Sequence, residues 1–249
     1  MDLKAFRMPR HPGRLLALGA ALGLALAFAG QGLLTSPAVQ PAAAQEDEQA
    51  AGDWPQLQHD VKRTGQNPAA LTGPFTQAWT RNLGVAMAHR LQPVIEGGVV
   101  VVGAVDGRVF GLTETTGAIQ WQYQTGGPIS YSAAIDGGKV FVASQDGYLY
   151  ALDLQTGALL WRAKTGRKPA GGAPLVYNGR VYVSGKDGYL RAFEIAANGS
   201  LAWAFDTALA NPPTLRAAIL SSPAISPAKG ALYFAAENLR AYAVNLANG

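Results

Sequence analysis

Three aspartates, each followed by glycine, recur along the chain at a spacing that could build a repeated ligand site. They are Asp106-Gly107, Asp146-Gly147 and Asp187-Gly188, spaced by 40 and 41 residues. Carboxylate oxygens are good calcium ligands, but calcium needs several oxygens that converge on one point. Each pair offers a single carboxylate between two alternating strand-like runs. We therefore predict hairpin turns, typically of type I′ with positive φ, and no metal site.

Other residue types that carry catalysis are scarce. Beyond residue 44 only His59 and His89 remain, 30 residues apart, and the chain has no cysteine. The chain therefore lacks the residues needed for a Ser-His-Asp triad, a histidine metal site, a cysteine zinc site or a disulfide. We predict no catalytic residue, which favours a non-enzymatic role.

Basic residues in the connections between repeats are the remaining candidates for binding. Four connections, 84–91, 125–131, 165–172 and 206–221, should lie on one rim together with the Asp-Gly turns. They carry Arg90, Arg167, Lys168 and Arg216. Loops on a rigid scaffold often carry binding residues, so we expect these four to contribute to a ligand or protein contact. The competing interpretation is ordinary solvated loop charge.

The overall charge of the chain argues against one class of partner. Residues 45–249 contain 16 basic and 15 acidic residues, a net charge of +1. A chain so nearly neutral has no electrostatic footprint for nucleic acid.

The first 44 residues have the layout of an export signal. Four basic residues precede the apolar run 15–29, and a small-residue string ends at Ala44. This pattern predicts a signal peptide cleaved after Ala44 and an extracellular or periplasmic protein. The alternative is an uncleaved anchor at residues 15–34, which would be the only membrane contact. Residues 45–52 are acidic and Ala-rich, and we expect a flexible lead-in.

Four tryptophans mark an internal repeat. Trp79, Trp121, Trp161 and Trp203 are spaced by 42, 40 and 42 residues. Complete repeats cover about 92–125, 132–165 and 173–206, and each contains four strand-like runs with the tryptophan on the last. Tandem units of four antiparallel strands predict an all-β fold built of β-propeller blades. The tryptophans recur with the structural period, so we expect them to pack between neighbouring blades.

The repeat resembles that of the pyrroloquinoline-quinone-type (PQQ-like) β-propellers. The resemblance is carried by A-x-D-x-x-T-G-x-x-x-W at 151–161, by SSPAI at 221–225 and by DWPQLQHDVKRTGQ at 53–66. It covers residues 53–249 and implies a ring of seven or eight blades, of which this chain supplies about four.

Two segments fit that pattern only in part. Phe75–Leu83 is similar to the outer strand of a missing blade, and residues 222–249 form an incomplete fourth unit with Glu237-Asn238 in place of Asp-Gly. We expect a fragment of a longer propeller, with self-association of two halves as the alternative.

The resemblance leaves three functional hypotheses. The favoured one is a non-catalytic exported module that binds or scaffolds protein or envelope components. The second is part of a quinoprotein dehydrogenase, for which the resemblance implies PQQ and calcium as cofactors. The residues present do not support these cofactors, because the chain lacks the adjacent cysteine pair that often accompanies them. The third is a sensor module of a larger receptor, favoured if residues 15–34 remain as an anchor.

Overall fold

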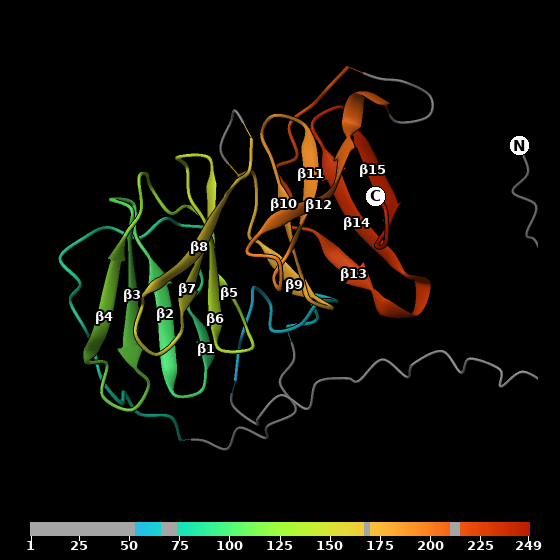
Figure 1. Cartoon of the computed structure of the whole chain (residues 1–249). Coiled ribbons are helices and arrows are strands. Elements are labelled where there is room, and N and C mark those ends of the chain that lie inside the picture. Colours follow the sequence, from blue (N-terminus) through green and yellow to red (C-terminus); the bar gives the residue numbers. More distant parts are fainter. Residues whose placement is uncertain (1–52, 66–73, 167–169, 210–214) are drawn as a thin grey trace, which may run out of the picture. The chain divides into compact units, whose positions relative to one another are not determined.

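The computed structural model of the chain describes residues 53–65, 74–166, 170–209 and 215–249 (Figure 1). The described residues all belong to one compact unit, Ala44–Gly249. The predicted signal peptide (1–44), the lead-in (45–52) and two predicted binding residues, Arg167 and Lys168, lie outside them. No helix in the described part of the chain is long and apolar enough to cross a membrane.

The described residues form antiparallel sheets, as predicted, and each repeat folds into one sheet. The first contains β1 (Val94–Glu96), β2 (Val99–Gly103), β3 (Arg108–Thr113) and β4 (Ile119–Gln124). The second contains β5 (Ala134–Asp136), β6 (Lys139–Ala143), β7 (Tyr148–Asp153) and β8 (Leu159–Lys164). The third contains β9 (Leu175–Tyr177), β10 (Arg180–Ser184), β11 (Tyr189–Glu194) and β12 (Ser200–Asp206).

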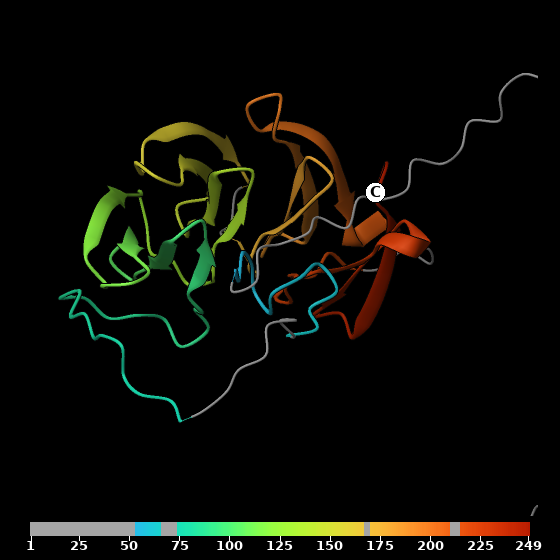
Figure 2. The same cartoon turned by 90° about the horizontal axis from the view of Figure 1, so that it is seen from below.

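The fourth sheet has three strands, β13 (Ala224–Ser226), β14 (Ala231–Ala236) and β15 (Arg240–Asn245). Helix is confined, among the described residues, to the short 3-10 turns Thr207–Leu209 and Pro227–Lys229. Strand order follows chain order in every sheet, so each is a meander of the kind that forms a propeller blade. We refer to the sheets as blades 1 to 4; Figure 2 shows them from below.

The Asp-Gly turns differ from the predicted type I′ geometry. Only the glycine of each pair has a positive φ, at 88°, 87° and 85°, and the aspartate does not. In blade 1 the Gly107 N–H donates to the carbonyl of Ala104 at 3.1 Å, which closes a four-residue turn. The aspartate carboxylate accepts the backbone N–H two residues further on, at 2.9 Å from Tyr148 in blade 2. The aspartate therefore stabilises the turn from its side chain, and the glycine alone supplies the left-handed residue.

The turn of blade 4 corrects the predicted alignment of the last repeat. Ala236 pairs with Arg240, so Asn238-Leu239 occupies the place of Asp-Gly, rather than Glu237-Asn238. Leu239 has a φ of 63°, like the glycines at this position. Leucine rarely adopts this conformation, because its Cβ approaches the following carbonyl at a cost of roughly 1–2 kcal/mol.

Each tryptophan of blades 1 to 3 lies between its own blade and the next. Trp121 and Trp161 are 7% and 8% exposed, and each belongs to an apolar cluster that spans two blades. The Trp121 Nε1–H donates to the carbonyl of Leu154 in blade 2 at 2.8 Å. Its ring lies against Gly157, which has no room for a side chain. Consecutive blades are thus held together by a buried ring and a matched glycine.

The segment around Trp79 forms no strand, contrary to the prediction for Phe75–Leu83. Trp79 is half-buried and makes the same contacts with blade 1 that Trp121 makes with blade 2. Its Nε1–H donates to the carbonyl of Glu114 at 2.7 Å, and its ring lies against Gly117. This segment pairs with no strand because the described residues contain no blade before blade 1.

The pre-blade segment, residues 53–65, contacts the innermost strand of every blade. The backbone N–H of the middle residue of each inner strand donates to this segment. The four bonds are Ile95 N–H to Trp54 O at 2.8 Å, Ile135 N–H to Pro55 O at 2.6 Å, Val176 N–H to Gln56 Oε1 at 3.4 Å and Ile225 N–H to Val61 O at 2.8 Å. One stretch of chain therefore satisfies equivalent donors on all four blades.

Arg63 anchors the end of this segment. Its guanidinium donates to the carbonyls of Pro223 at 3.1 Å and Pro174 at 3.5 Å, and to that of Leu57. Burial lowers the pKa of Arg63 to about 10, although nearby Asp60 acts in the opposite direction. The three carbonyls come from blades 3 and 4 and from the segment itself, so Arg63 ties these parts together.

Candidate binding rim

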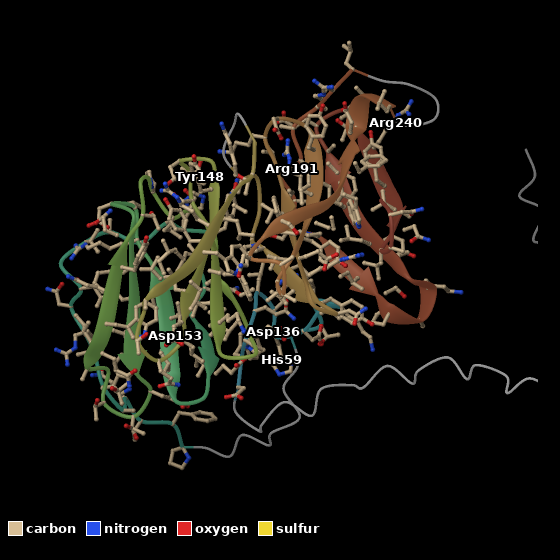
Figure 3. The ribbon with its side chains drawn as sticks, viewed as in Figure 1. His59, Asp136, Tyr148, Asp153, Arg191 and Arg240 are labelled. Atoms are coloured by element: carbon tan, nitrogen blue, oxygen red, sulfur yellow. The ribbon has the colours of Figure 1, made fainter. Side chains whose placement is uncertain are left out.

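The connections that follow the outer strands pack against the Asp-Gly turns, which places both on one rim of the blades. The Thr125 N–H donates to the Gly107 carbonyl at 2.9 Å, and the Gly126 N–H donates to the Asp146 carboxylate at 2.9 Å. Each connection therefore bridges the turn of its own blade and that of the next. Figure 3 shows Tyr148, Arg191 and Arg240, on the strands that follow the equivalent turns of blades 2 to 4, on the upper side, and Asp136, Asp153 and His59 on the lower side.

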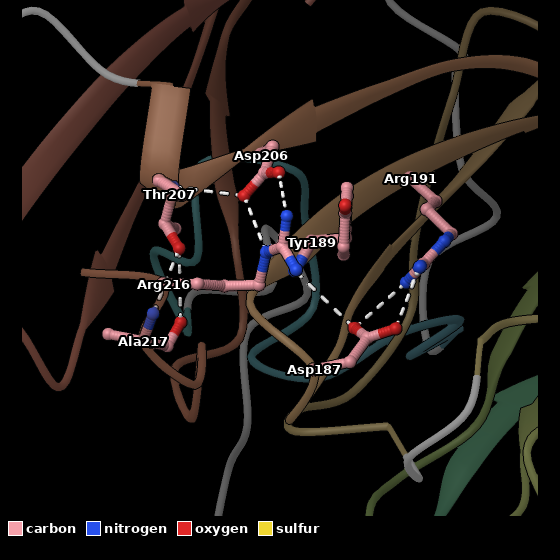
Figure 4. Close-up of polar contacts among 8 residues, drawn as sticks. Asp187, Tyr189, Arg191, Asp206, Thr207, Arg216 and Ala217 are labelled. Carbon is pink, nitrogen blue, oxygen red and sulfur yellow. Dashed lines mark hydrogen bonds and ion pairs between the residues drawn. The ribbon is translucent and has the colours of Figure 1, made fainter. Parts of the chain in front are cut away.

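Asp206 and Arg216 form a two-point ion pair on this rim. Arg216 Nε donates to Asp206 Oδ1 at 2.9 Å, and Arg216 Nη2 pairs with Asp206 Oδ2 (Figure 4). The carboxylate side chain is 8% exposed and the guanidinium 48% exposed. The Arg216 hydrogen bonds lower the pKa of Asp206 to about 2. The pair joins the end of β12 to the connection between blades 3 and 4, while one face of the guanidinium stays in solvent.

Tyr189 lies between two arginines. The guanidinium of Arg191 is 4.6 Å from the centre of its ring, and that of Arg216 is 4.8 Å from it. Arg191 also holds Asp187 through hydrogen bonds of 3.0 Å and 2.7 Å. A hydrogen bond to Asp206 raises the pKa of Tyr189 above its ordinary value. Alternating charges and a stacked ring make this part of the rim rigid and polar.

Three exposed leucines lie close to the polar cluster in the chain or on the adjoining turn of blade 4. Leu209 is 80% exposed, Leu215 is 89% exposed and Leu239 is 97% exposed. The loop of Leu215 and the turn of Leu239 are joined by a hydrogen bond from the Glu237 N–H to the Ala218 carbonyl at 3.0 Å. Large exposed apolar side chains that lie on one rim make this rim the candidate interaction surface. We call Leu209, Leu215, Arg216 and Leu239 the leucine rim.

The structure separates the predicted binding residues. Arg216 lies on the leucine rim. Arg90 is exposed on the connection that contacts the turn of blade 1, where the Val105 N–H donates to the Ala86 carbonyl at 3.1 Å. No contact joins Arg90 to Arg216 within the described residues.

The sequence interpretation did not find Asp206, Tyr189 or the leucines. One signal was available. The residue before the repeated threonine is Asp206 in the third repeat, whereas it is Gln124 in the first and Lys164 in the second. Leu239 was hidden by the wrong alignment of the last turn.

The described residues do not fit a quinone with calcium. They contain no group of three or more histidine, cysteine, aspartate or glutamate side chains that could hold a metal ion. The three repeated aspartates are engaged separately: Asp106 pairs with Arg108, Asp146 accepts from Tyr150, and Asp187 pairs with Arg191. Their carboxylates bond within their own blades or to the adjacent connection, so they do not converge on one cation.

The fold is that of a β-propeller, and the comparisons agree with it. A family model of PQQ repeats, described as outer membrane protein assembly factor BamB, matches residues 70–133 and 125–249. Because these matches span most of the chain, the protein belongs to this PQQ-repeat family. A comparison with curated protein sequences finds no match.

Solved structures show the same fold. BamB from Moraxella catarrhalis matches with 24% identity and a TM-score of 0.57, over 68% of this chain and 49% of its own. A quinohemoprotein alcohol dehydrogenase from Pseudomonas putida HK5 matches with 21% identity and a TM-score of 0.68, over 80% and 39%. The computationally designed Ika4 protein matches with 14% identity and a TM-score of 0.57, over 69% and 99%. The chain thus spans less than half of the two natural proteins.

Proposed function

We propose that the chain is a non-catalytic, exported binding module that holds a protein of the cell envelope on its leucine rim. The observation that carries this proposal is Leu239. Blades 1 to 3 have glycine at this turn position, whereas blade 4 has a leucine with a φ of 63° and an exposed fraction of 97%. A strained backbone that presents an apolar side chain to water costs stability and gains nothing within the chain.

The surroundings of Leu239 support a protein as the ligand. Leu209 and Leu215 add apolar surface, and the exposed face of Arg216 adds a polar group already fixed by Asp206. An apolar centre with a fixed arginine is the composition of protein interfaces. The description of the matching family, an outer membrane protein assembly factor, favours a partner in the envelope.

Site-specific photo-crosslinking tests this proposal. A photoreactive amino acid at Leu239 should give one discrete adduct with an envelope protein, and Leu215→Asp should abolish it. The matched control is Leu201, which is 54% exposed on β12 away from the rim. Identical patterns at the two positions, or no adduct at Leu239, would contradict the proposal.

A second measurement separates this function from that of a quinoprotein dehydrogenase. The full chain is mixed with PQQ and calcium, and both quinone uptake and reduction of a dye are measured. We expect neither. Stoichiometric uptake with turnover would replace the binding role with an enzymatic one, and a rim variant such as Leu215→Asp would then leave it unchanged.

A further inference from the structure

Three Asn-Gly pairs occur in the chain: Asn178-Gly179, Asn198-Gly199 and Asn248-Gly249. This dipeptide has a reactivity of its own, because the backbone nitrogen of the glycine can attack the carbonyl carbon of the asparagine side-chain amide. Glycine permits the approach since it has no side chain to block it. The structure places the three pairs in different surroundings, so we expect them to react at different rates.

Asn178 and Gly179 are the two central residues of the hairpin turn between β9 and β10. Their φ angles are 50° and 71°, so both are left-handed, as a type I′ turn requires. Blades 1 and 2 make the same turn with two glycines, Gly97-Gly98 and Gly137-Gly138, whose φ angles lie between 54° and 78°. Asparagine tolerates this conformation, but the other blades show that the turn does not require it.

The Gly179 nitrogen is not engaged in the fold. Among the described residues its N–H makes no backbone hydrogen bond, and no atom lies within 4 Å of a Cβ added to Gly179. Asn178 and Gly179 are both exposed. The turn is held by its carbonyl instead, because the Ile195 N–H donates to the Gly179 oxygen at 3.0 Å. Both the attacking nitrogen and the amide that it attacks are therefore open to solvent.

The other two pairs are protected by the fold. The Gly199 N–H donates to the Glu194 carbonyl at 2.9 Å, and the Gly249 N–H donates to that of Asn245 at 2.9 Å. Each glycine also lies against a tryptophan ring, so that a methyl group on Gly199 would come within 2.5 Å of Trp161. Attack by either nitrogen first requires its turn to open, which costs the hydrogen bond and the packing between blades.

We propose that Asn178 is a modification site at which the side-chain amide is lost as ammonia. The Gly179 nitrogen gives its proton to solvent and bonds to the Asn178 Cγ. The bond from Cγ to the amide nitrogen breaks, and the departing amide takes up a proton and leaves as ammonia. The product is a succinimide ring, which water opens at either carbonyl carbon. The result is aspartate, or isoaspartate in which the main chain runs through Cγ.

Either product changes a charged part of blade 3. Asn178, Arg180 and Glu194 line the same pocket, and Arg180 pairs with Glu194 at 2.8 Å. A carboxylate at position 178 places a second acid beside Arg180. Because this turn lies at the end of the blade opposite the Asp-Gly turns, the inference is independent of the function proposed for the leucine rim.

Isoaspartate has a further consequence for the pre-blade segment. It lengthens the backbone of the turn through which β9 pairs with β10. β9 holds the pre-blade segment through the bond from the Val176 N–H to Gln56 Oε1 at 3.4 Å. Conversion of Asn178 should therefore loosen β9 and its contact with this segment.

Ageing of the purified 249-residue chain in mildly alkaline buffer, followed by peptide mapping with mass spectrometry, tests this inference. The peptide that contains Asn178 should gain the mass of an amide converted to an acid and separate into aspartate and isoaspartate forms. Asn198 and Asn248 should convert at least about tenfold more slowly, because their turns must open first. In denaturant the three pairs should convert at similar rates, since the fold then protects none of them.

Asn178→Gly is the matched variant, because it gives blade 3 the glycine pair of blades 1 and 2 and removes the amide. It should fold like the parent and keep its hydrogen-exchange protection at Val176 during ageing, whereas the parent should lose protection there. No conversion at Asn178, or equal conversion at all three pairs in the folded chain, would overturn the inference. Unchanged Val176 protection in the converted parent would refute the predicted effect on β9.

Discussion

Gly157 lies so close to the ring of Trp121 that a methyl group on its Cα would come within 2.5 Å of a ring carbon. The same relationship joins Gly199 to Trp161 and Gly249 to Trp203. The Thr-Gly turn of one blade is therefore shaped by the tryptophan of the blade before it. Gly157 therefore meets two requirements at once: the positive φ of its turn and the close approach of the Trp121 ring.

Gly157→Ala should destabilise the chain more than an ordinary loss of glycine. Its φ of 69° costs alanine about 1 kcal/mol, and the clash with Trp121 adds roughly 1–3 kcal/mol. Gly138→Ala is the matched control, because Gly138 has a φ of 71° but no atom within 4 Å of an added Cβ. Urea unfolding of the two variants measures the difference. Equal losses would mean that the ring exerts no steric constraint on the turn.

Trp161→Ala should lower the free energy of unfolding by about 3–5 kcal/mol, because the ring is buried between blades 2 and 3. Leu160→Ala, one residue earlier, is the control. Leu160 is 45% exposed, so its loss should cost less than about 1 kcal/mol. Thermal or urea unfolding compares them, and unchanged stability in Trp161→Ala would refute the role of this ring between blades.

Arg63→Met should destabilise the chain strongly while Lys62→Met should not. The Arg63 guanidinium donates to three carbonyls, and its removal leaves them without these donors at a cost of roughly 1–3 kcal/mol each for the buried ones. Lys62 is exposed. Hydrogen exchange at Ile95 and Ile225 gives a direct measurement, since both amides donate to the pre-blade segment. Unchanged protection in Arg63→Met would show that Arg63 does not hold this segment in place.

The Asp206–Arg216 pair should make stability depend on pH in the acid range. The pKa of Asp206 is lowered to about 2 from 3.8, so its contribution is complete above about pH 4 and is lost as the pH falls towards 2. Arg216→Gln should lower the free energy of unfolding at pH 7 only modestly, because the guanidinium is half exposed and its ion pair is screened by solvent. The deficit should shrink towards pH 2. Lys229→Gln, on an exposed turn, should show no such trend, and an Arg216→Gln deficit that is constant with pH would contradict the assignment.

Leu239→Gly should raise stability and lower binding at once. Glycine removes the cost of a positive φ, a gain of about 1 kcal/mol, and takes away the exposed side chain of the leucine rim. Urea unfolding and the yield of an adduct from a photoreactive group at Leu215 measure the two effects. If stability rises and the adduct is unaffected, the rim binds without Leu239.

Much of the fold could be predicted from the sequence because the repeat is strong. The tryptophan spacing and the Asp-Gly pairs recur in register, and a blade needs only its own strands to define its order. The inner strands begin at residues 94, 134, 175 and 224, in each case two residues after the start of the predicted unit at 92, 132, 173 or 222. The preceding residues bond to the neighbouring blade instead, as the Gln92 N–H does to Ser132 Oγ at 2.7 Å.

The candidate site was harder to predict. Arg216 was found as a loop charge, but its partner Asp206 lies ten residues earlier and meets it only through the fold. Leu239 could not be recognised as a residue in a glycine position until the pairing of Ala236 with Arg240 fixed the turn. The exposed fraction of a side chain depends on which residues the fold places beside it, and no local sequence pattern predicts this.

The pre-blade segment has a consequence for the order of events during synthesis. It leaves the ribosome before any blade does, yet one of its donors, Ile225, is made more than 160 residues later. A growing chain must therefore keep this segment unattached, or only partly attached, until the last described sheet appears. Its final docking would mark the moment at which the separate sheets become a single cooperative unit. The pre-blade segment is therefore synthesised first and docks last.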